Sequence, residues 1–390
     1  MMYHPQEGTV VYNVDERQQT IREQVKEFAE KEILPVCQEL DLRKESFSFE
    51  HYRKLAKAGM VGFAMPKEYG GGGRSSIEYI TLIEELTYYD PPTGLMAAIP
   101  QLATYPIFTF GSEEQKKKYV PRCASGEIIP SFALTEPDAG SDAANQQTLA
   151  MIKGDHFVIN GEKTFIMHGD VCNLAVLFCR LGEKDEHRTK ISCILVETDT
   201  PGWNARTLQH KMGMRAATTG HIKIENVRAP LENQLGDTGK GFRIAMNTLD
   251  GARIGVGAQG VGISQRALDE SIKHYEECLA SGAPGDRLQE IQCLIADMST
   301  QTEAARVITY KAAQTQDAGE NCTVEAAQAK MFASEVARFC VDQAMQIHSG
   351  YGPIGQLSII EKLVRDQRVT EIYEGTNEIQ RLVIANHLLR

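Results

Sequence analysis

The sequence predicts an α+β protein in which a helical region, a β region and a second helical region follow one another along the chain. With 390 residues the chain is too long for one compact core, so two or three domains are expected. Its hydrophobic periodicity changes from helical spacing to the alternation of strands and later changes back. Helices and strands that are segregated in this way are typical of the α+β class.

The first region, residues 1–125, is expected to form a helical domain. Apolar residues between positions 21 and 33 recur at intervals of three and four, and residues 78–89 repeat this pattern. Residues 66–73 read Pro-Lys-Glu-Tyr-Gly-Gly-Gly-Gly, a composition that predicts a loop. The lysines at 116–118 are most simply a solvated helix face.

The second region, residues 126–237, is expected to form a β domain. Residues 156–159 and 163–166 have strand-like composition and flank Asn160-Gly161, a dipeptide that favours a tight hairpin turn. Further strands are predicted where apolar residues alternate or run together, at 174–178, 191–196 and 221–224.

The third region, residues 238–390, returns to long helical patterns. We expect helices over 254–275, 288–313 and 324–347, followed by a last pair that is broken at Gly375. Long helices joined by short loops predict a four-helix bundle.

Composition excludes several classes of function. The formal net charge of −11 argues against nucleic acid or an anionic membrane as the main partner. No apolar run reaches the roughly 18 residues of a membrane span, and the N-terminus lacks the pattern of a signal peptide. The nine cysteines are scattered without a Cys-x-x-Cys motif, and no His/Cys cluster suggests a metal site. We therefore expect a soluble cytoplasmic protein without a metal.

Two glycine motifs resemble nucleotide-binding signatures, and we reject both. Gly255-x-Gly257-x-x-Gly260 lacks a preceding strand and continues into a helix, so these glycines more simply permit close helix packing. The glycines at 70–73 are followed by Arg-Ser-Ser, whereas a phosphate-binding Walker loop continues with Gly-Lys-Ser/Thr.

The loop at residues 134–142 is a candidate binding segment. It reads Leu-Thr-Glu-Pro-Asp-Ala-Gly-Ser-Asp and lies where helical patterning changes to β patterning, a place where ligand clefts often form. Its small residues, backbone N–H groups and two hydroxyls could hold a ring edge or a pyrophosphate. A plain turn is the alternative interpretation.

A second candidate is the turn Tyr373-Glu374-Gly375-Thr376 between the last two helical patterns. A carboxylate on such a turn can point into a cleft and act as a base. The alternative is a solvated loop glutamate without a chemical role.

Five blocks in order make the chain resemble the acyl-CoA dehydrogenases from its first helix to its C-terminus. The blocks are ALTEPDAGSDA (133–143), NGEKTFI (160–166), KMGMRAATT (211–219), LDGARIGVGAQ (249–259) and IYEGTNEIQR (372–381). The resemblance implies an N-terminal helical domain, a middle β-barrel and a C-terminal four-helix bundle. It also implies FAD, a homotetramer built as a dimer of dimers, and electron transfer to an electron-transfer flavoprotein.

The resemblance further implies α,β-dehydrogenation of an acyl-CoA thioester, with the α-proton taken by a carboxylate and the β-hydride passed to flavin N5. Glu374 matches the family's usual base. Some members place the base directly before the arginine that matches Arg253, but that position is Ala252 in this chain.

Other positions of this chain match the family's ligand contacts. Positions that match FAD contacts are Phe132, Leu134, Thr135, Gly140, Ser141, Phe165, Met167, Gln346, Gly350, Thr376 and Glu378. Positions that match contacts to the acyl-CoA are Ser141, Asp250, Arg253 and Gly375.

The chain departs from the family's pattern at three places near the flavin. Phe165-Ile166-Met167 replaces a Trp-Ile-Thr/Ser triplet, so the aromatic ring is kept and the hydroxyl is lost. In family members the helix usually continues from the position of Tyr275 into Glu-Arg. This chain lacks that arginine, and Arg287 could replace it if the loop folds back. Ser349 stands where members usually have a glycine.

The substrate and the direction of reaction are open. The segment 87–100 contributes to the family's acyl pocket and contains no arginine, which favours a neutral acyl group that is short, branched or cyclic. Asp90 could be a second acid or base in this substrate pocket, or could simply cap a helix. Alternative functions are an enoyl-CoA reductase, a dehydrogenase of acyl groups on a carrier protein, and a flavin-poor scaffold paralogue.

Overall fold

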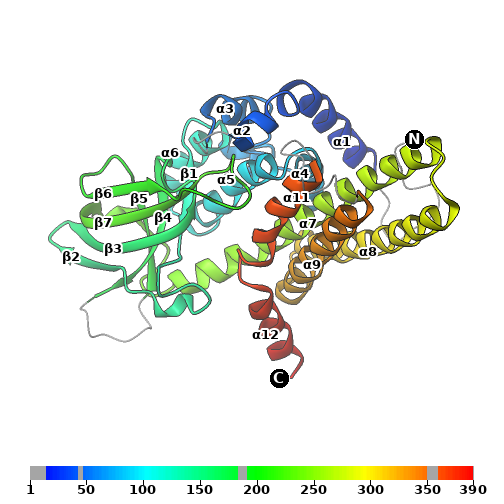
Figure 1. Cartoon of the computed structure of the whole chain (residues 1–390). Coiled ribbons are helices and arrows are strands. Elements are labelled where there is room, and N and C mark those ends of the chain that lie inside the picture. Colours follow the sequence, from blue (N-terminus) through cyan, green and yellow to red (C-terminus); the bar gives the residue numbers. More distant parts are fainter. Residues whose placement is uncertain (1–14, 43–46, 183–190, 349–358, 390) are drawn as a thin grey trace.

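The computed structural model describes residues 15–42, 47–182, 191–348 and 359–389, and Figure 1 shows the β-sheet region at the left with most of the helices to its right. The N-terminal helices are α1 (Glu16–Phe28), α2 (Cys37–Leu42), α3 (Phe49–Lys57), α4 (Ser76–Tyr89), α5 (Pro91–Phe110) and α6 (Glu113–Ala124). A π-helical turn, η1 (Ala29–Ile33), continues α1. The predicted helical pattern of this region is confirmed, and residues 67–69 within the predicted loop form only a 3-10 turn.

Local capping fixes where these helices begin. Asp15, Ser75 and Ser112 each accept a hydrogen bond from the backbone at the third helical position, and a Gln or Glu at that position bonds back. Such a capping box satisfies backbone donors that have no partner inside the helix. Helices α4 and α5 are buried on most of their surface, so they form the inner layer of this domain.

The middle region is one eight-stranded sheet. Its strands are β1 (Pro130–Ala133), β2 (Leu149–Lys153), β3 (His156–Met167), β4 (Leu174–Leu181), β5 (Ile191–Glu197), β6 (Trp203–Thr207), β7 (Thr219–Pro230) and β8 (Gln234–Leu235). The order is β6-β7-β3-β2-β4-β5-β8, and β1 pairs with β4 in parallel.

Strand β4 shows how both faces of this sheet are buried. Leu174, Val176 and Phe178 pack against α5, α6 and the helix that follows the sheet, whereas Ala175 and Leu177 point to the opposite face. The core on that opposite face consists of strand residues only. The sheet therefore curls around its own core, as the predicted barrel requires, and β6 and β8 lie at the two ends of the strand order.

The hairpin predicted at Asn160-Gly161 is wrong. Strand β3 runs through this dipeptide, and the register with β7 shifts there as it does at a β-bulge. The Asn160 Oδ1 atom accepts a 2.8 Å hydrogen bond from the backbone of Asn226, while a Cβ at Gly161 would lie 2.5 Å from Thr148 Oγ1. The glycine therefore serves close packing, and the real turn is Gly154-Asp155 between β2 and β3.

The C-terminal region is a helical bundle, as expected. Its helices are α7 (Gly241–Ala280), α8 (Gly285–Asp317), α9 (Thr323–Ile347), α11 (Ile359–Gln367) and α12 (Asn377–Leu388). Helices α7, α8 and α9 pack side by side, and α12 extends away from the rest of the chain at the bottom of Figure 1. The pattern changes from helices to strands between Ala124 and Pro130, and back between Leu235 and Gly241.

The glycines of α7 permit close contact between helices, which supports rejecting a dinucleotide fingerprint. A Cβ at Gly257 would lie 2.9 Å from Thr309 Oγ1 on α8, and one at Gly260 would lie 2.6 Å from the carbonyl oxygen of Ala333 on α9. A Cβ at Gly262 would lie 2.4 Å from the carbonyl oxygen of Glu84 on α4. Helix α7 thus approaches three other helices at positions where a side chain would not fit.

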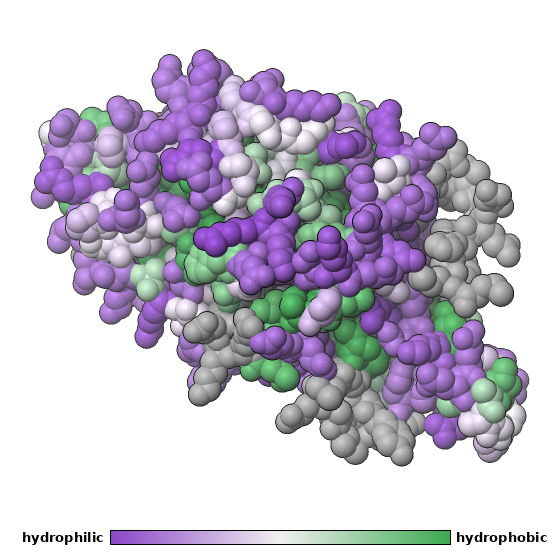
Figure 2. Space-filling view, turned by 90° about the horizontal axis from the view of Figure 1, so that it is seen from above, coloured by the Kyte–Doolittle hydropathy of each residue, from purple (hydrophilic) through white to green (hydrophobic). Residues whose placement is uncertain are grey.

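The outer surface agrees with the charged composition of the chain. The face in Figure 2 is mostly hydrophilic, with hydrophobic residues in smaller areas between polar ones. Every helix in the described part of the chain is too short or too polar to cross a membrane.

Replacement of Gly260 by alanine is expected to separate α7 from α9. Because the added methyl group would meet backbone at 2.6 Å, Gly260→Ala should lower the free energy of unfolding by about 1–3 kcal/mol. Gly285→Ala is the control, since a Cβ there meets nothing within 4 Å. Chemical denaturation of both variants measures the difference, and equal stability would contradict close packing at Gly260.

Candidate active site

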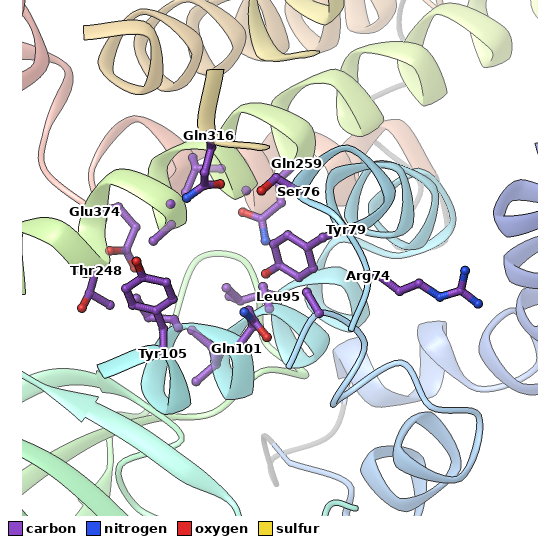
Figure 3. Close-up of a pocket in the computed structure, with 18 of the residues that line it drawn as sticks. Arg74, Ser76, Tyr79, Leu95, Gln101, Tyr105, Thr248, Gln259, Gln316 and Glu374 are labelled. Carbon is purple, nitrogen blue, oxygen red and sulfur yellow. The ribbon is translucent and has the colours of Figure 1, made fainter. Parts of the chain in front are cut away.

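A cavity of about 270 Å³ lies between α4, α5 and α7 and is bordered by Glu374. Its apolar and aromatic wall includes Leu95, Ile99, Leu102, Tyr105, Val256 and Tyr373. In Figure 3, Glu374, Thr248 and Tyr105 lie on the left and Tyr79 lies on the right. The predicted turn carboxylate therefore reaches a largely apolar cavity, and the segment 87–100 contributes to that cavity as expected.

The backbone of the turn that carries Glu374 is held by two long side chains. Glu374 has a φ of 56° and Gly375 a φ of 93°, and the left-handed region is unfavourable for a glutamate. Arg253 Nε donates to the carbonyl oxygen of Glu374 at 3.2 Å. Gln380 Nε2 donates to the same oxygen at 3.2 Å and to the Gly375 carbonyl at 2.9 Å. These bonds maintain a conformation that the local sequence alone would not favour.

Residues on both sides of Glu374 are anchored as well. The Tyr373 hydroxyl donates to the Gln259 side chain on α7. Thr376 is the N-cap of α12, and Asn377 accepts a 2.7 Å hydrogen bond from Lys330 Nζ on α9. The turn is thus fixed to α7 and α9 before and after the carboxylate.

The surroundings set the acidity of Glu374. Burial raises the pKa of Glu374 to about 7, and the positive charges of Arg253 and Lys330 oppose this rise. In the described part of the chain, no donor hydrogen-bonds either oxygen of the Glu374 carboxylate. A carboxylate with these properties can exchange a proton near neutral pH.

Arg253 connects this turn to other predicted substrate contacts. Its Nη1 donates to Asp250 Oδ1 at 2.8 Å, and Asp250 Oδ2 accepts from the Thr323 hydroxyl at 2.7 Å. Asp250, Arg253 and Gly375 are therefore brought together. Ala252, at the family's alternative base position, lines the cavity and carries no titratable group.

Lys163 joins the two predicted flavin loops of the middle sheet. This fully buried ammonium donates to the Leu134 carbonyl at 2.7 Å and forms a 2.9 Å ion pair with Glu136. The backbone N–H of Thr164 also donates to the carbonyl oxygen of Thr135 at 3.0 Å. Because a buried charge without a partner is costly, this arrangement fixes the loops to each other.

Phe165 has a conformation that packing within the chain does not explain. Its φ is 56° and its side chain is 68% exposed, although bulky residues rarely adopt this conformation. An exposed aromatic ring in a strained backbone suggests a surface prepared for a flat ligand. Gly140 leaves open space on the first loop, since a Cβ there would meet nothing within 4 Å.

Met167 lies between this surface and the cavity. It packs with Leu95, Ile99 and Met214, and its sulfur accepts a 3.3 Å hydrogen bond from the Thr219 hydroxyl. A hydroxyl is therefore present beside the position at which the chain lacks the family's Thr or Ser.

The remaining flavin candidates divide between the sheet and the C-terminal helices. Phe132 packs against Phe178, Leu134 is buried, and Ser141 is exposed. Gln346 and Glu378 are exposed on α9 and α12. Ser349 and Gly350 lie outside the described residues.

Asp90 is not among the described residues that line the cavity, in contrast to its predicted substrate contact. It is almost fully buried, caps α5 by accepting from Thr93, and forms a 2.8 Å ion pair with Lys362. Lys362 also pairs with Asp366, which accepts from the backbone of Met214. Asp90 is therefore a helix cap, which was the alternative interpretation of this residue.

The pKa of His274 is lowered by burial, by His348 and by the positive charge of Arg287. Arg287 therefore lies near His274. The short loop 281–284 thus brings the start of α8 back to α7, as the predicted replacement of the missing arginine requires. Its contact with a flavin remains a prediction.

Comparison with known proteins identifies the family. Models of the acyl-CoA dehydrogenase N-terminal, middle and C-terminal domains match residues 15–127, 131–227 and 239–389. The chain belongs to the acyl-CoA dehydrogenase family. A short-chain specific acyl-CoA dehydrogenase of Clostridium acetobutylicum is 40% identical over 97% of this chain and 100% of its own length. An acryloyl-CoA reductase (NADH) of Anaerotignum propionicum is also 40% identical, over 97% and 96% of the two chains.

Solved structures show the same fold. Butyryl-CoA dehydrogenase from Megasphaera elsdenii matches with a TM-score of 0.92 and 36% identity, over 98% of this chain and 100% of its own. A chain in the structure of the electron transferring flavoprotein of Acidaminococcus fermentans matches with a TM-score of 0.93 and 39% identity, over the same shares. The chain is therefore an oxidoreductase.

The cofactor of this family is FAD. An acyl-CoA dehydrogenase complexed with FAD from Bacillus anthracis matches with a TM-score of 0.88 and 29% identity, over 100% of this chain and 68% of its own. The exposed ring of Phe165, the open loop at Gly140 and the hydroxyl of Thr219 beside Met167 fit a flavin.

Sequence reasoning missed several residues of the site. Lys163 and Gln380 lie within the blocks 160–166 and 372–381, but the blocks alone did not indicate what these side chains bond. Lys330 lies in no block, and its partner Asn377 is 47 residues away. The polar side chains of Tyr79, Gln101 and Gln316 at the cavity were missed for the same reason. Of these positions, only Tyr79 lies within a segment, 78–89, that gave a helical signal.

Removal of the Lys163 charge should weaken both the fold and FAD binding. Lys163→Met leaves the buried Glu136 carboxylate without its ion pair, so the free energy of unfolding should fall by about 3–5 kcal/mol. Lys153→Met on the exposed side of β2 should change it by about 0.5 kcal/mol or less. Chemical denaturation and titration with FAD, followed by flavin fluorescence, measure both effects. Equal stability and FAD affinity of the two variants would exclude a positioning role for Lys163.

Proposed function

We propose that this chain removes hydrogen from the α and β carbons of an acyl-CoA thioester, with Glu374 as the base. The observation that carries this proposal is the Glu374 carboxylate at a largely apolar cavity with a pKa raised to about 7. A carboxylate with its ordinary acidity would be a weaker base toward a carbon acid.

The proton and the hydride have different destinations. The α-proton passes to the Glu374 carboxylate, and bound FAD supplies the two-electron acceptor for the β-hydride, which leaves a double bond between the two carbons. The largely apolar wall of the cavity surrounds the reacting carbons, and burial holds the base ready at neutral pH. Arg253 and Gln380 keep the base at one position by holding its carbonyl oxygen.

Charge that develops on the thioester oxygen needs a hydrogen-bond donor. In the described part of the chain, no backbone carbonyl accepts from the N–H groups of Glu374 or Gly375. We infer that an N–H group of this turn would donate to the thioester oxygen, and bound FAD would supply a second donor. Such a donor stabilises the enolate-like transition state more than the substrate.

The cavity favours a neutral acyl group. Arg74 borders it, but this side chain is 47% exposed, pairs with Glu78 at 2.9 Å and points away from the cavity in Figure 3. No other Arg or Lys lines the cavity in the described part of the chain, so a distal carboxylate would lack a counter-charge. A short acyl group agrees with the name of the Clostridium acetobutylicum relative.

The electron acceptor is proposed to be an electron-transfer flavoprotein, which agrees with the match to a chain in the Acidaminococcus fermentans structure. The reverse reaction, reduction of an enoyl-CoA, is a second candidate because the Anaerotignum propionicum relative is named a reductase. Action on acyl groups of a carrier protein is a weaker alternative, supported by the likeness to the solved prolyl acyl carrier protein oxidase AnaB at 29% identity.

A homotetramer, built as a dimer of dimers in the cytoplasm, is part of the proposal. Leu382 and Leu388 on α12 are 57% and 71% exposed, and α12 packs mainly against α9. Large exposed apolar side chains on an extended helix are typical of a subunit interface.

Replacement of Glu374 by glutamine should abolish proton removal while leaving binding intact. Glu374→Gln keeps the shape of the side chain and removes its basicity, so kcat should fall by about 100-fold or more. Anaerobic mixing with acyl-CoAs measures this as loss of flavin bleaching. Glu50→Gln, at a side chain that is 79% exposed on α3, is the control. Normal bleaching by Glu374→Gln would exclude it as the base.

The pH dependence should report the raised pKa of Glu374. Only the carboxylate form accepts a proton, so the bleaching rate should increase with pH around a midpoint of about 7 and be lost below it. Because the charge of Lys330 lowers the pKa of Glu374, Lys330→Met should move the midpoint to higher pH. Lys273→Met, on an exposed part of α7, should leave it in place. A midpoint below pH 5 would contradict a buried base.

A further inference from the structure

The cavity beside Glu374 has polar groups that the dehydrogenation does not use. Gln101 on α5, Tyr79 on α4 and Gln316 on α8 line the same cavity. Figure 3 shows Gln316 above, Gln101 below and Tyr79 to the right of the space that Glu374 borders on the left. An unsubstituted aliphatic acyl chain would leave all three without a partner.

Gln101 provides the clearest signal. Its Oε1 atom is buried and has no hydrogen-bond partner among the described residues. A buried acceptor without a donor costs free energy, and native proteins rarely keep such a group unless a ligand or water completes it. A carbonyl or a carboxylate on the acyl group could not complete it, because neither carries a proton to donate.

Tyr79 supplies the complementary donor. Its hydroxyl has no hydrogen-bond partner in the described part of the chain, and burial raises the pKa of Tyr79 well above its usual value. The hydroxyl therefore remains protonated and can donate to an oxygen in the cavity. A substrate atom between these groups would both donate to Gln101 and accept from Tyr79.

Gln316 is brought to the cavity by a glycine on α7. A Cβ at Gly251 would lie 2.9 Å from Gln316 Nε2, so this amide rests directly on the backbone of α7. Its side chain has no partner among the described residues and adds further donors to the cavity wall.

The charged groups nearby are already neutralised or bound. Asp317 accepts from the backbone N–H groups of Ser76 and Ile77 at 2.6 and 3.1 Å, and Arg74 pairs with Glu78. The unused groups are thus neutral donors and acceptors. A hydroxyl fits them, since it donates one hydrogen bond and accepts others.

We propose that the preferred substrate is an acyl-CoA that carries a hydroxyl group beyond the β-carbon, held by Gln101 and Tyr79. This inference rests on the proposed function and names the substrate class of the same site. The hydroxyl is not altered in the reaction, so the bonds formed and broken are those of the proposed dehydrogenation. Gln101 and Tyr79 act as specificity-determining residues.

The test compares acyl-CoAs of four to six carbons with and without a terminal hydroxyl. For the FAD-loaded protein, kcat/KM with artificial electron acceptors should be about tenfold higher for the best hydroxylated chain than for its unsubstituted counterpart. Gln101→Met removes the amide and keeps the length of the side chain, so it should abolish this ratio while still oxidising the unsubstituted chain. Gln314→Met, at an exposed residue of α8 outside the cavity, should keep the ratio.

The outcomes separate this inference from the proposed function. Oxidation of unsubstituted acyl-CoAs with equal or lower kcat/KM for every hydroxylated chain would overturn the inference and leave the dehydrogenation standing. An unchanged ratio in Gln101→Met would also overturn it, because the amide would then be solvated rather than bound to substrate. Absence of flavin bleaching with all acyl-CoAs would instead refute the proposed function.

Discussion

The site depends on one constraint, which is that the carbonyl oxygen of Glu374 is held while no donor among the described residues bonds its carboxylate. Arg253 and Gln380 both donate to this carbonyl and thereby maintain a left-handed glutamate. Had these side chains bonded the carboxylate, they would have stabilised its charge and lowered its pKa. Holding the backbone therefore gives a fixed position without the loss of basicity.

Helix α7 makes this arrangement possible because some of its residues pack against other helices and others hold the turn of Glu374. Gly257, Gly260 and Gly262 bring α8, α9 and α4 into close contact, while Arg253 and Gln259 reach the turn. The closeness of α9 in turn places Lys330 where it pairs with Asn377 just after Gly375. Packing at the glycines and the chemistry at Glu374 are thus properties of one helix.

Much of the fold and the base could be predicted from the sequence, because helical spacing, strand alternation and ordered motifs are local signals. The hairpin at Asn160-Gly161 could not be excluded locally, since the contacts of this dipeptide with Thr148 and Asn226 come from other parts of the chain. Asp90 was ambiguous for a similar reason, because its partner Lys362 lies 272 residues away. The polar cavity groups lacked any signal, as they come from three helices and bond to no other residue in the described part of the chain.

The polar atoms of Tyr79, Gln101 and Gln316 that bond to none of the described residues also have an evolutionary consequence. Changes of these atoms break no hydrogen bond within the described fold, whereas changes at Arg253, Gln380 and Lys163 do. Mutations at the first three positions can therefore explore new acyl groups while the base and the flavin loops stay intact. Such a separation of adaptable residues from constrained ones is a structural route by which related enzymes with different substrates can diverge.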